Sequence, residues 1–188
     1  MNRRKALLGT ALISGIVYSG YKLFDFFTPH NIEKLDLNKA LIDELAEIII
    51  PRTETPGAKD VLAGELIIKL LKDCTTTNTQ NNFIAGLMQL KSAAISEYGK
   101  EFLNCSLPQQ ITLLNIIEQD EKPFNGIVWK IQKKLLGKSF IYTLKEYTTK
   151  AYCTSMLGAT QGLKYVLIPG RRLACTDAEP NQKSWATQ

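Results

Sequence analysis

The sequence predicts an all-α protein, with a single compact domain of about five to six helices between an N-terminal export or anchor segment and an irregular C-terminal tail. Three observations lead to this class. Apolar residues recur every three and four positions along most of the chain, and no segment sustains the strict alternation typical of strands. Turn-rich stretches with proline and glycine separate the periodic segments. The length of 188 residues suits one such domain, since single domains commonly contain about 100–200 residues.

Residues 1–27 combine paired arginines with a long apolar run. Arg3 and Arg4 precede the run that starts at Ala6, and positive charge before an apolar core is the arrangement of an export segment. The surrounding residues resemble the twin-arginine consensus, which directs the export of folded proteins, although Asn2 stands where Ser or Thr is usual. One alternative is an ordinary signal peptide or signal anchor that happens to carry two arginines. Because no clear cleavage site follows, an uncleaved membrane anchor is another.

The positive charge of the chain lies mostly in that segment. Residues 1–27 hold four basic side chains and one acidic side chain, so without them the net charge falls from +5 to +2. A lysine cluster at helical spacing remains, which is typical of a solvated helix face; it consists of Lys130, Lys133, Lys134 and Lys138. Because nucleic-acid binding needs a larger cationic face, we expect no nucleic acid among the partners.

The first two expected helices flank a turn-rich stretch. The first starts at Asp36 or Asn38 and stops before Pro51, since proline cannot continue a helix. Residues 51–57 then contain two prolines, two threonines and a glycine. The apolar stripe of residues 61–71 predicts the second helix.

The next two helices carry local start and stop signals. The third covers residues 80–98 and is closed by Gly99, because glycine adopts the left-handed conformation that ends helices. The fourth starts at Ser106, with Pro108 in its first turn and Gln109 at the position of a capping-box partner.

The last part of the chain is less regular. The fifth helix begins near Pro123, reaches Leu144 and is interrupted at Gly137. From Thr148 onward we expect a loop, then a short helix over residues 159–166, and an irregular tail.

Residue types that carry chemistry are scarce. His30 is the single histidine and lies beside the N-terminal segment, so the sequence excludes a histidine-based triad or a multi-histidine metal site within the domain. Residues 137–139 imitate the end of a phosphate-binding loop but lack its earlier glycine. Glu118, Asp120 and Glu121 at a helix end are interpreted as solvated surface. We therefore expect no catalytic set, cofactor site or metal site in this chain.

The four cysteines fit an exported chain, because an even number permits complete disulfide pairing in an oxidising compartment. A helix of about 20 residues spans about 30 Å, which disfavours a bond between Cys74 and Cys105 at its two ends. The expectation is a disulfide from Cys153 to Cys105 or Cys175, with Cys74 as a free buried thiol. Four small buried side chains without bonds are the alternative.

Two segments are more specific than a generic helical bundle. Residues 49–58 join a helix stop to hydroxyls, a proline and a glycine, which suits a rigid connector or a simple turn. Residues 152–175 place aromatics beside glycines and prolines, which suits the plug of a bundle end or a docking surface. The candidate partner contacts are Pro51, Thr53, Thr55, Pro56, Gly57, Tyr152, Ser155, Gly158, Tyr165, Pro169 and Gly170.

These segments resemble the gluconate 2-dehydrogenase subunit 3 family over roughly residues 37–175. Residues 49–58 match the family stretch I-I-P-x-T-D-T-P-G-A, with Glu54 in place of the aspartate. Residues 151–170 match a later stretch that contains G-Y-Y-T-S, a glycine, L-x-Y and P-G. The departures there are Ala151 for glycine, Cys153 for tyrosine, and Ala174 before Cys175 where the family has Gly-Cys.

The resemblance implies a non-catalytic small (gamma) subunit of a periplasmic, membrane-associated dehydrogenase that oxidises a sugar, sugar acid or polyol. FAD and the catalytic residues are then expected on a large subunit similar to the glucose–methanol–choline (GMC) oxidoreductases, and a cytochrome c subunit often accepts the electrons. The small subunit would support the large one and provide its twin-arginine export signal. The alternatives are a stand-alone membrane-anchored helical binding protein of the cell envelope and an enzyme with an unrecognised site.

The expected organisation therefore has four parts. Residues 1–27 form the export signal or anchor, residues 28–36 a linker, residues 37–175 the helical small-subunit domain, and residues 176–188 the C-terminal tail.

Overall fold

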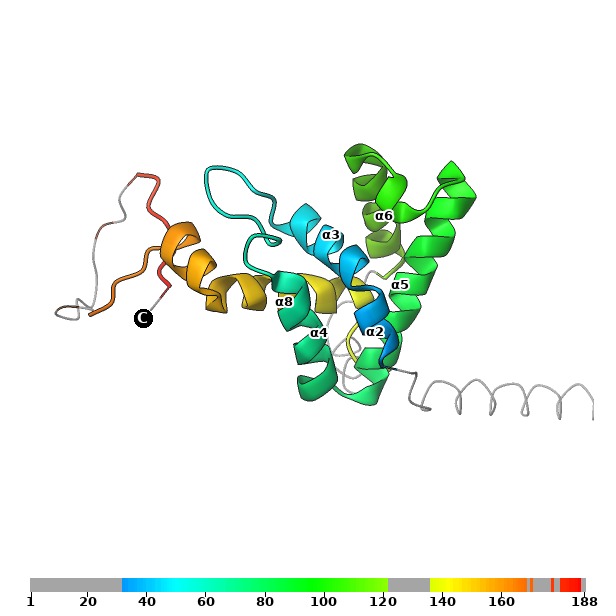
Figure 1. Cartoon of the computed structure of the whole chain (residues 1–188), viewed down its shortest axis with the longest axis horizontal. Coiled ribbons are helices and arrows are strands. Elements are labelled where there is room, and N and C mark those ends of the chain that lie inside the picture. The colour runs from blue at the N-terminus through cyan, green and yellow to red at the C-terminus, as the bar shows by residue number, and fades with distance from the viewer. Residues whose placement is uncertain (1–31, 122–135, 169, 171–176, 178–179, 187–188) are drawn as a thin grey trace, which may run out of the picture.

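The computed structural model describes residues 32–121, 136–168, 170, 177 and 180–186, and this part of the chain is helical (Figure 1). Its elements are α2 (Lys34–Leu37), α3 (Lys39–Ile49), α4 (Ala63–Cys74), α5 (Thr77–Tyr98), the 3₁₀ turn η1 (Phe102–Asn104), α6 (Leu107–Asp120), α8 (Phe140–Thr154) and the π-helical turn η2 (Gly158–Gly162). The all-α prediction is confirmed. The export segment and the start of the expected fifth helix lie outside the described residues.

The predicted helix boundaries follow local signals. At the start of α6 the Ser106 backbone N–H donates to Gln109 Oε1 over 3.0 Å, as a capping box requires. Gly99 ends α5 with φ +64°. Gly137, with φ +81°, precedes α8 and accounts for the expected interruption.

Two expectations for the last part of the domain are wrong. No loop begins at Thr148, because α8 continues to Thr154 and buries Thr148 and Ala151 on the same face as its first half. The short helix expected over residues 159–166 is the shorter π-helical turn η2, in which the Leu163 N–H donates to the carbonyl of Gly158, five residues earlier. Helical periodicity therefore continues from Thr148 to Thr154. It was not recognised in the sequence because threonine and tyrosine are weak helix formers.

Helix α8 is the centre of the core, since it packs against α3, α4, α5 and α6. At its start, the fully buried rings of Phe140 and Phe83 meet edge to face with centroids 5.1 Å apart. Gly86 of α5 permits this approach, because a Cβ there would lie 2.2 Å from Phe140 Cγ. The α5–α8 contact is therefore the tightest aromatic junction that we describe in the fold.

The carboxylate of Glu121, just after α6, caps the start of α8. Its two oxygens accept the backbone N–H groups of Phe140 and Ile141 over 3.1 and 3.0 Å. The interpretation of Glu121 as solvated surface is therefore wrong. Its neighbour Glu118 remains a surface residue and pairs with Lys145.

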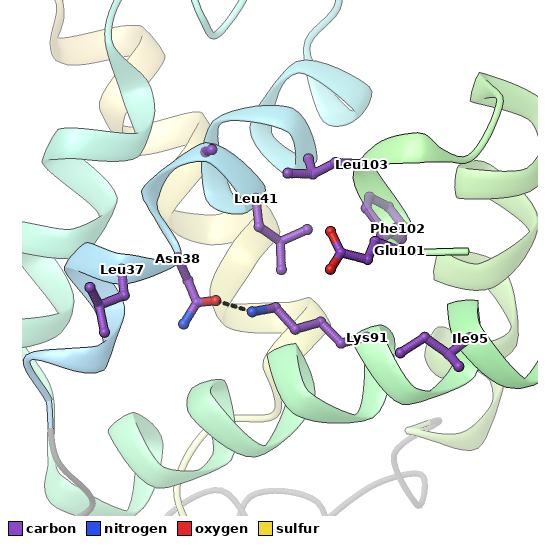
Figure 2. A pocket seen from close by; sticks show the side chains of 9 residues that line it. Leu37, Asn38, Leu41, Lys91, Ile95, Glu101, Phe102 and Leu103 are labelled. Carbon is purple, nitrogen blue, oxygen red and sulfur yellow. Dashed lines mark hydrogen bonds between the residues drawn. The ribbon is translucent and has the colours of Figure 1, made fainter. Parts of the chain in front are cut away.

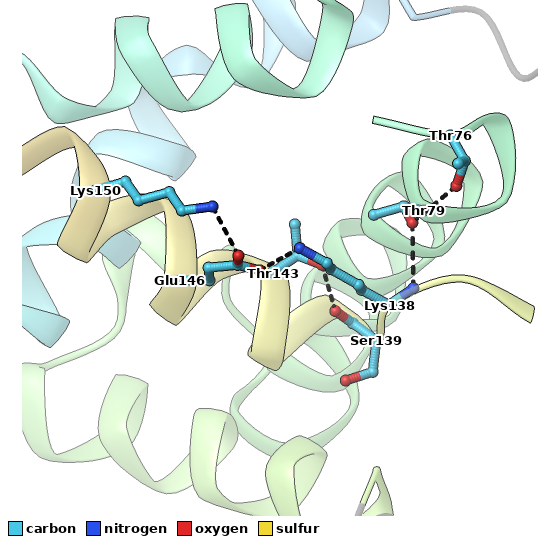
Figure 3. A network of polar contacts seen from close by, with 7 residues as sticks. All are labelled: Thr76, Thr79, Lys138, Ser139, Thr143, Glu146 and Lys150. Atoms are coloured by element: carbon cyan, nitrogen blue, oxygen red, sulfur yellow. Dashed lines mark hydrogen bonds and ion pairs between the residues drawn. The ribbon is translucent and has the colours of Figure 1, made fainter. Parts of the chain in front are cut away.

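The residues before α8 are fastened to α5 by side-chain hydrogen bonds. Thr79 Oγ1 accepts the Lys138 N–H over 3.1 Å (Figure 3), and Asn82 Nδ2 donates to the carbonyls of Leu136 and Lys138 over 2.8 and 3.0 Å. Together with Glu121, these bonds fix the entry of α8 against both α5 and α6.

Glu146 of α8 lies between two lysines, Lys138 just before the helix and Lys150 one turn further along it. Lys138 Nζ and Lys150 Nζ bond its two carboxylate oxygens (Figure 3), and the second distance is 2.7 Å. Partial burial of the carboxyl would raise its pKa, but the hydrogen bonds from the two lysines outweigh this effect and lower the pKa of Glu146 below its ordinary value.

The lowered pKa of Glu146 makes the stability contribution of this cluster pH-dependent. Ionised Glu146 stabilises the fold above its unfolded-state pKa, and this contribution is lost as the pH falls through the lower folded-state pKa. We expect Glu146→Gln to lose about 0.5–1 kcal/mol near neutral pH, as for partly exposed ion pairs, and to lose less below about pH 4. Urea unfolding of the wild type and Glu146→Gln at several pH values measures this loss, with Glu97→Gln on the exposed face of α5 as the control. A stability difference between wild type and Glu146→Gln that stays the same in acid would contradict the prediction.

Within the described ranges, no helix is both long enough and apolar enough to cross a membrane.

Candidate functional site at the connector and the end of helix α8

The connector between α3 and α4, residues 50–60, is fixed by Glu47 of α3. Its two carboxylate oxygens accept the backbone N–H groups of Arg52 and Lys59 over 2.9 and 2.8 Å, at opposite ends of the loop. The Gly57 backbone lies so close to the Glu47 carboxylate that a Cβ on Gly57 would be 2.5 Å from Glu47 Oε1. The connector therefore wraps around one carboxylate.

Further bonds make the connector rigid. Asp60 accepts the Gly57 N–H over 2.8 Å and pairs with Arg52 over 3.3 Å. The Ala58 N–H donates to the Ile50 carbonyl over 2.9 Å, and the Ala58 side chain is fully buried. The prediction of a rigid connector thus has a specific basis: its backbone N–H groups find fixed acceptors.

Tyr152, in the last turn of α8, joins the two predicted segments. Its hydroxyl donates to the Pro56 carbonyl over 2.9 Å, although the two residues lie 96 positions apart. A Cβ on Gly162 would lie 2.2 Å from the Tyr152 hydroxyl oxygen. The Tyr152 side chain therefore contacts both the connector and the turn η2.

The turn from α8 into η2 depends on Ser155 and Gly158. Ser155 Oγ donates to the Tyr152 carbonyl over 2.7 Å and accepts the Gly158 N–H over 3.0 Å. A Cβ on Gly158 would lie 2.0 Å from the same carbonyl oxygen. Gly158 is thus needed for close backbone approach.

The candidate partner contacts fall into two groups. The buried group has Gly57, Tyr152 and Gly158, and Thr55, Pro56 and Ser155 are half-buried beside it. The exposed group has Pro51, Thr53, Tyr165 and Gly170, whereas Pro169 lies outside the described residues. The buried residues hold the two segments together, and the exposed ones are open to a partner. In Figure 1 the connector and the end of α8 project from the same end of the helical bundle.

Sequence reasoning missed several residues at this end. The roles of Glu47 and Asp60 could not be predicted from the sequence, because both accept backbone N–H groups of the connector and these bonds depend on its conformation. Sequence reasoning named the segment after Tyr152 as a possible docking surface but did not single out its exposed apolar side chains or the one in the tail, which are Met156 (78% exposed), Leu167 (78%), Ile168 (80%) and Trp185 (45%). A tryptophan in an otherwise polar tail was the available signal.

The cysteine expectations are corrected by the structure. Cys74, Cys105 and Cys153 are free thiols, so the expected disulfide of Cys153 is not formed. Cys105 is buried and donates to the Glu101 carbonyl, 3.5 Å away, whereas Cys153 is exposed on α8. Cys74 is free as expected but exposed, not buried. Cys175 lies outside the described residues.

A separate groove of about 170 Å³ lies where the junction of α2 and α3 faces α5 and η1 (Figure 2). Its walls are mainly apolar, with Leu37, Leu41 and Phe102 among them. Lys91 of α5 reaches across it to the Asn38 side-chain oxygen. Among the candidate partner contacts that the structure describes, none lines this groove.

Within the ranges that the structure describes, no group of three or more His, Cys, Asp or Glu side chains is placed to hold a metal ion. Comparison with curated proteins and with solved structures returned no significant match.

Comparison with protein-family models gave one match. The model described as gluconate 2-dehydrogenase subunit 3 aligns with residues 36–170, which is most of the chain and includes both the connector and the turn after α8. The match agrees with the resemblance of residues 49–58 and 151–170, and the two stretches meet at the Tyr152–Pro56 hydrogen bond. The chain belongs to the gluconate 2-dehydrogenase subunit 3 family.

Proposed function

We propose that this chain is the non-catalytic small subunit of a periplasmic, membrane-associated dehydrogenase of sugars, sugar acids or polyols. Its role is to bind, stabilise and export a large flavoprotein subunit of the GMC type. The observation that carries the proposal is the family match over residues 36–170, because the family is one of dehydrogenase subunits.

The connector end of the domain is the proposed contact with the large subunit. A surface that is already rigid loses less conformational entropy on binding, and the Glu47 and Tyr152 hydrogen bonds fix the connector before any partner arrives. Exposed apolar side chains that follow η2 in the chain, such as Leu167 and Ile168, supply the surface that such a contact would bury.

FAD and the catalytic residues belong, in this proposal, to the large subunit, and a cytochrome c subunit receives the electrons where one is present. The small subunit then contributes no cofactor of its own. The Arg3–Arg4 pair explains how a partner that binds FAD in the cytoplasm reaches the periplasm, since the twin-arginine route exports folded proteins.

The shared export signal gives a test. Replacing Arg3 and Arg4 together with lysine keeps the charge but removes the paired guanidinium groups that define the signal. We expect both this chain and the flavoprotein to remain in the cytoplasm, measured by quantitative detection of each protein in separated cell fractions.

The matched control replaces Arg171 and Arg172 with lysine, because this second arginine pair lies far from the N-terminus. It should leave both proteins in the periplasmic fraction. Normal delivery of the flavoprotein in the Arg3/Arg4 variant would sink the shared-signal proposal, and a periplasmic chain with no flavoprotein attached would favour a stand-alone binding protein.

A further inference from the structure

The C-terminal segment, residues 183–186, returns to pair with the chain just after η2. The Lys164 N–H donates to the Ser184 carbonyl over 2.8 Å, and the Ala186 N–H donates to the Lys164 carbonyl over 3.0 Å. These two bonds form a parallel β-bridge between Lys164 and Trp185. Lys164 therefore uses both of its backbone hydrogen-bonding groups on the C-terminal segment.

Side chains reinforce this pairing. The Lys164 ammonium lies 4.5 Å from the centroid of the Trp185 ring, within the range of a cation–π interaction. Lys183 Nζ donates to the Gln161 carbonyl of η2 over 2.6 Å. Backbone and side-chain contacts thus select an extended segment that places an aromatic residue over Lys164.

The paired residue Lys164 lies between η2 and two exposed apolar side chains. Lys164 follows η2 directly, and η2 is in turn held to the connector through Tyr152. The exposed side chains of Leu167 and Ile168 come three and four residues after Lys164. Anchoring Lys164 therefore limits where this apolar pair can lie. The anchoring segment lies beyond residue 170, where the family match ends.

We propose that Lys164 is the centre of a binding site for an extended peptide segment with an aromatic residue, and that its occupant is the chain's own segment 183–186. This C-terminal clasp braces the partner-facing end of the domain. The bracing role rests on the proposed function, whereas the clasp itself does not.

The clasp can be tested without unfolding the domain, because the hydrophobic core of the described residues ends at Tyr152. The experiment measures amide hydrogen exchange in the full-length chain, in Trp185→Ala, and in a chain truncated after Gln182. Ser184→Ala is the matched control, since Ser184 contributes its backbone carbonyl to the bridge.

We expect slow exchange of the Lys164 amide in the full-length chain and in the Ser184→Ala control. Loss of the cation–π contact in Trp185→Ala should speed this exchange about two- to fivefold, and truncation should bring it to the rate of an unstructured peptide. Far-UV circular dichroism should stay the same in all four proteins. Unprotected Lys164 in the full-length chain, or equal exchange in Trp185→Ala and Ser184→Ala, would overturn the clasp.

A second readout separates the clasp from the proposed function. With the flavoprotein subunit present, truncation should weaken its association with this chain, and unchanged association would overturn the bracing role. If the full-length chain binds no flavoprotein at all, the proposed function fails while the exchange result still decides the clasp.

Discussion

Phe140→Ala should lower the free energy of unfolding by about 3–5 kcal/mol, the largest stability loss that we expect from a single truncation. Phe140 is 1% exposed and packs against the fully buried Phe83, and the adjacent Gly86 has no side chain that could fill the vacated space. The loss is a large part of the total stability of a typical domain, which is about 5–15 kcal/mol. Urea unfolding followed by far-UV circular dichroism measures it.

Met88→Ala is the control for this truncation. Met88 lies on α5 like Phe83 and Gly86 but is 59% exposed, so its loss should change stability by no more than about 0.5 kcal/mol. Equal effects of the two substitutions would mean that the α5–α8 junction is not the centre of the core.

Gly158→Ala should lower the free energy of unfolding by about 1–3 kcal/mol and weaken association with the flavoprotein subunit. The added Cβ would lie 2.0 Å from the Tyr152 carbonyl oxygen and 2.8 Å from Ser155 Oγ. Relief requires the backbone to move, which displaces Tyr152 from Pro56 and separates η2 from the connector. Alanine ordinarily stabilises a helical turn relative to glycine by about 1 kcal/mol, so a loss at this position identifies the close contact.

Gly170→Ala is a matched control from the same family stretch. Gly170 is exposed, and no atom lies within 4 Å of the position that its Cβ would take. Its substitution should leave the free energy of unfolding unchanged. Thermal unfolding compares the two variants, and an equal loss of stability would contradict the structural role that we assign to Gly158.

The parts of the fold that could be predicted from sequence are those encoded by neighbouring residues. The capping box of Ser106 and Gln109 and the left-handed Gly99 each involve residues within one helical turn, and both were predicted correctly. The all-α class followed from periodicity in the same local way.

The parts that could not be predicted depend on contacts between distant residues. Glu121 looked like surface because its partners, the N–H groups of Phe140 and Ile141, lie about 20 positions away. The two family stretches could be recognised separately, but nothing in the sequence showed that Tyr152 would donate to Pro56. The end of α8 was placed too early because β-branched and aromatic residues favour strands and loops when considered alone, and burial against α3 and α4 outweighs that preference here.

The function proposed for this chain depends mostly on other subunits. Membership of the gluconate 2-dehydrogenase subunit 3 family makes the chain part of a dehydrogenase complex. The connector end is the surface proposed to bind the catalytic subunit, and the Arg3–Arg4 pair is the signal proposed to export both.

Purification of the full-length chain from its native cells tests the central claim most directly, with the bound protein identified by mass spectrometry and its flavin by absorbance. The account predicts a flavoprotein of the GMC type with a Gly-x-Gly-x-x-Gly sequence near its start, retained by the wild-type chain and by the surface variant Met88→Ala but depleted from Gly158→Ala. A folded, monodisperse wild-type chain that carries no flavoprotein would contradict the account.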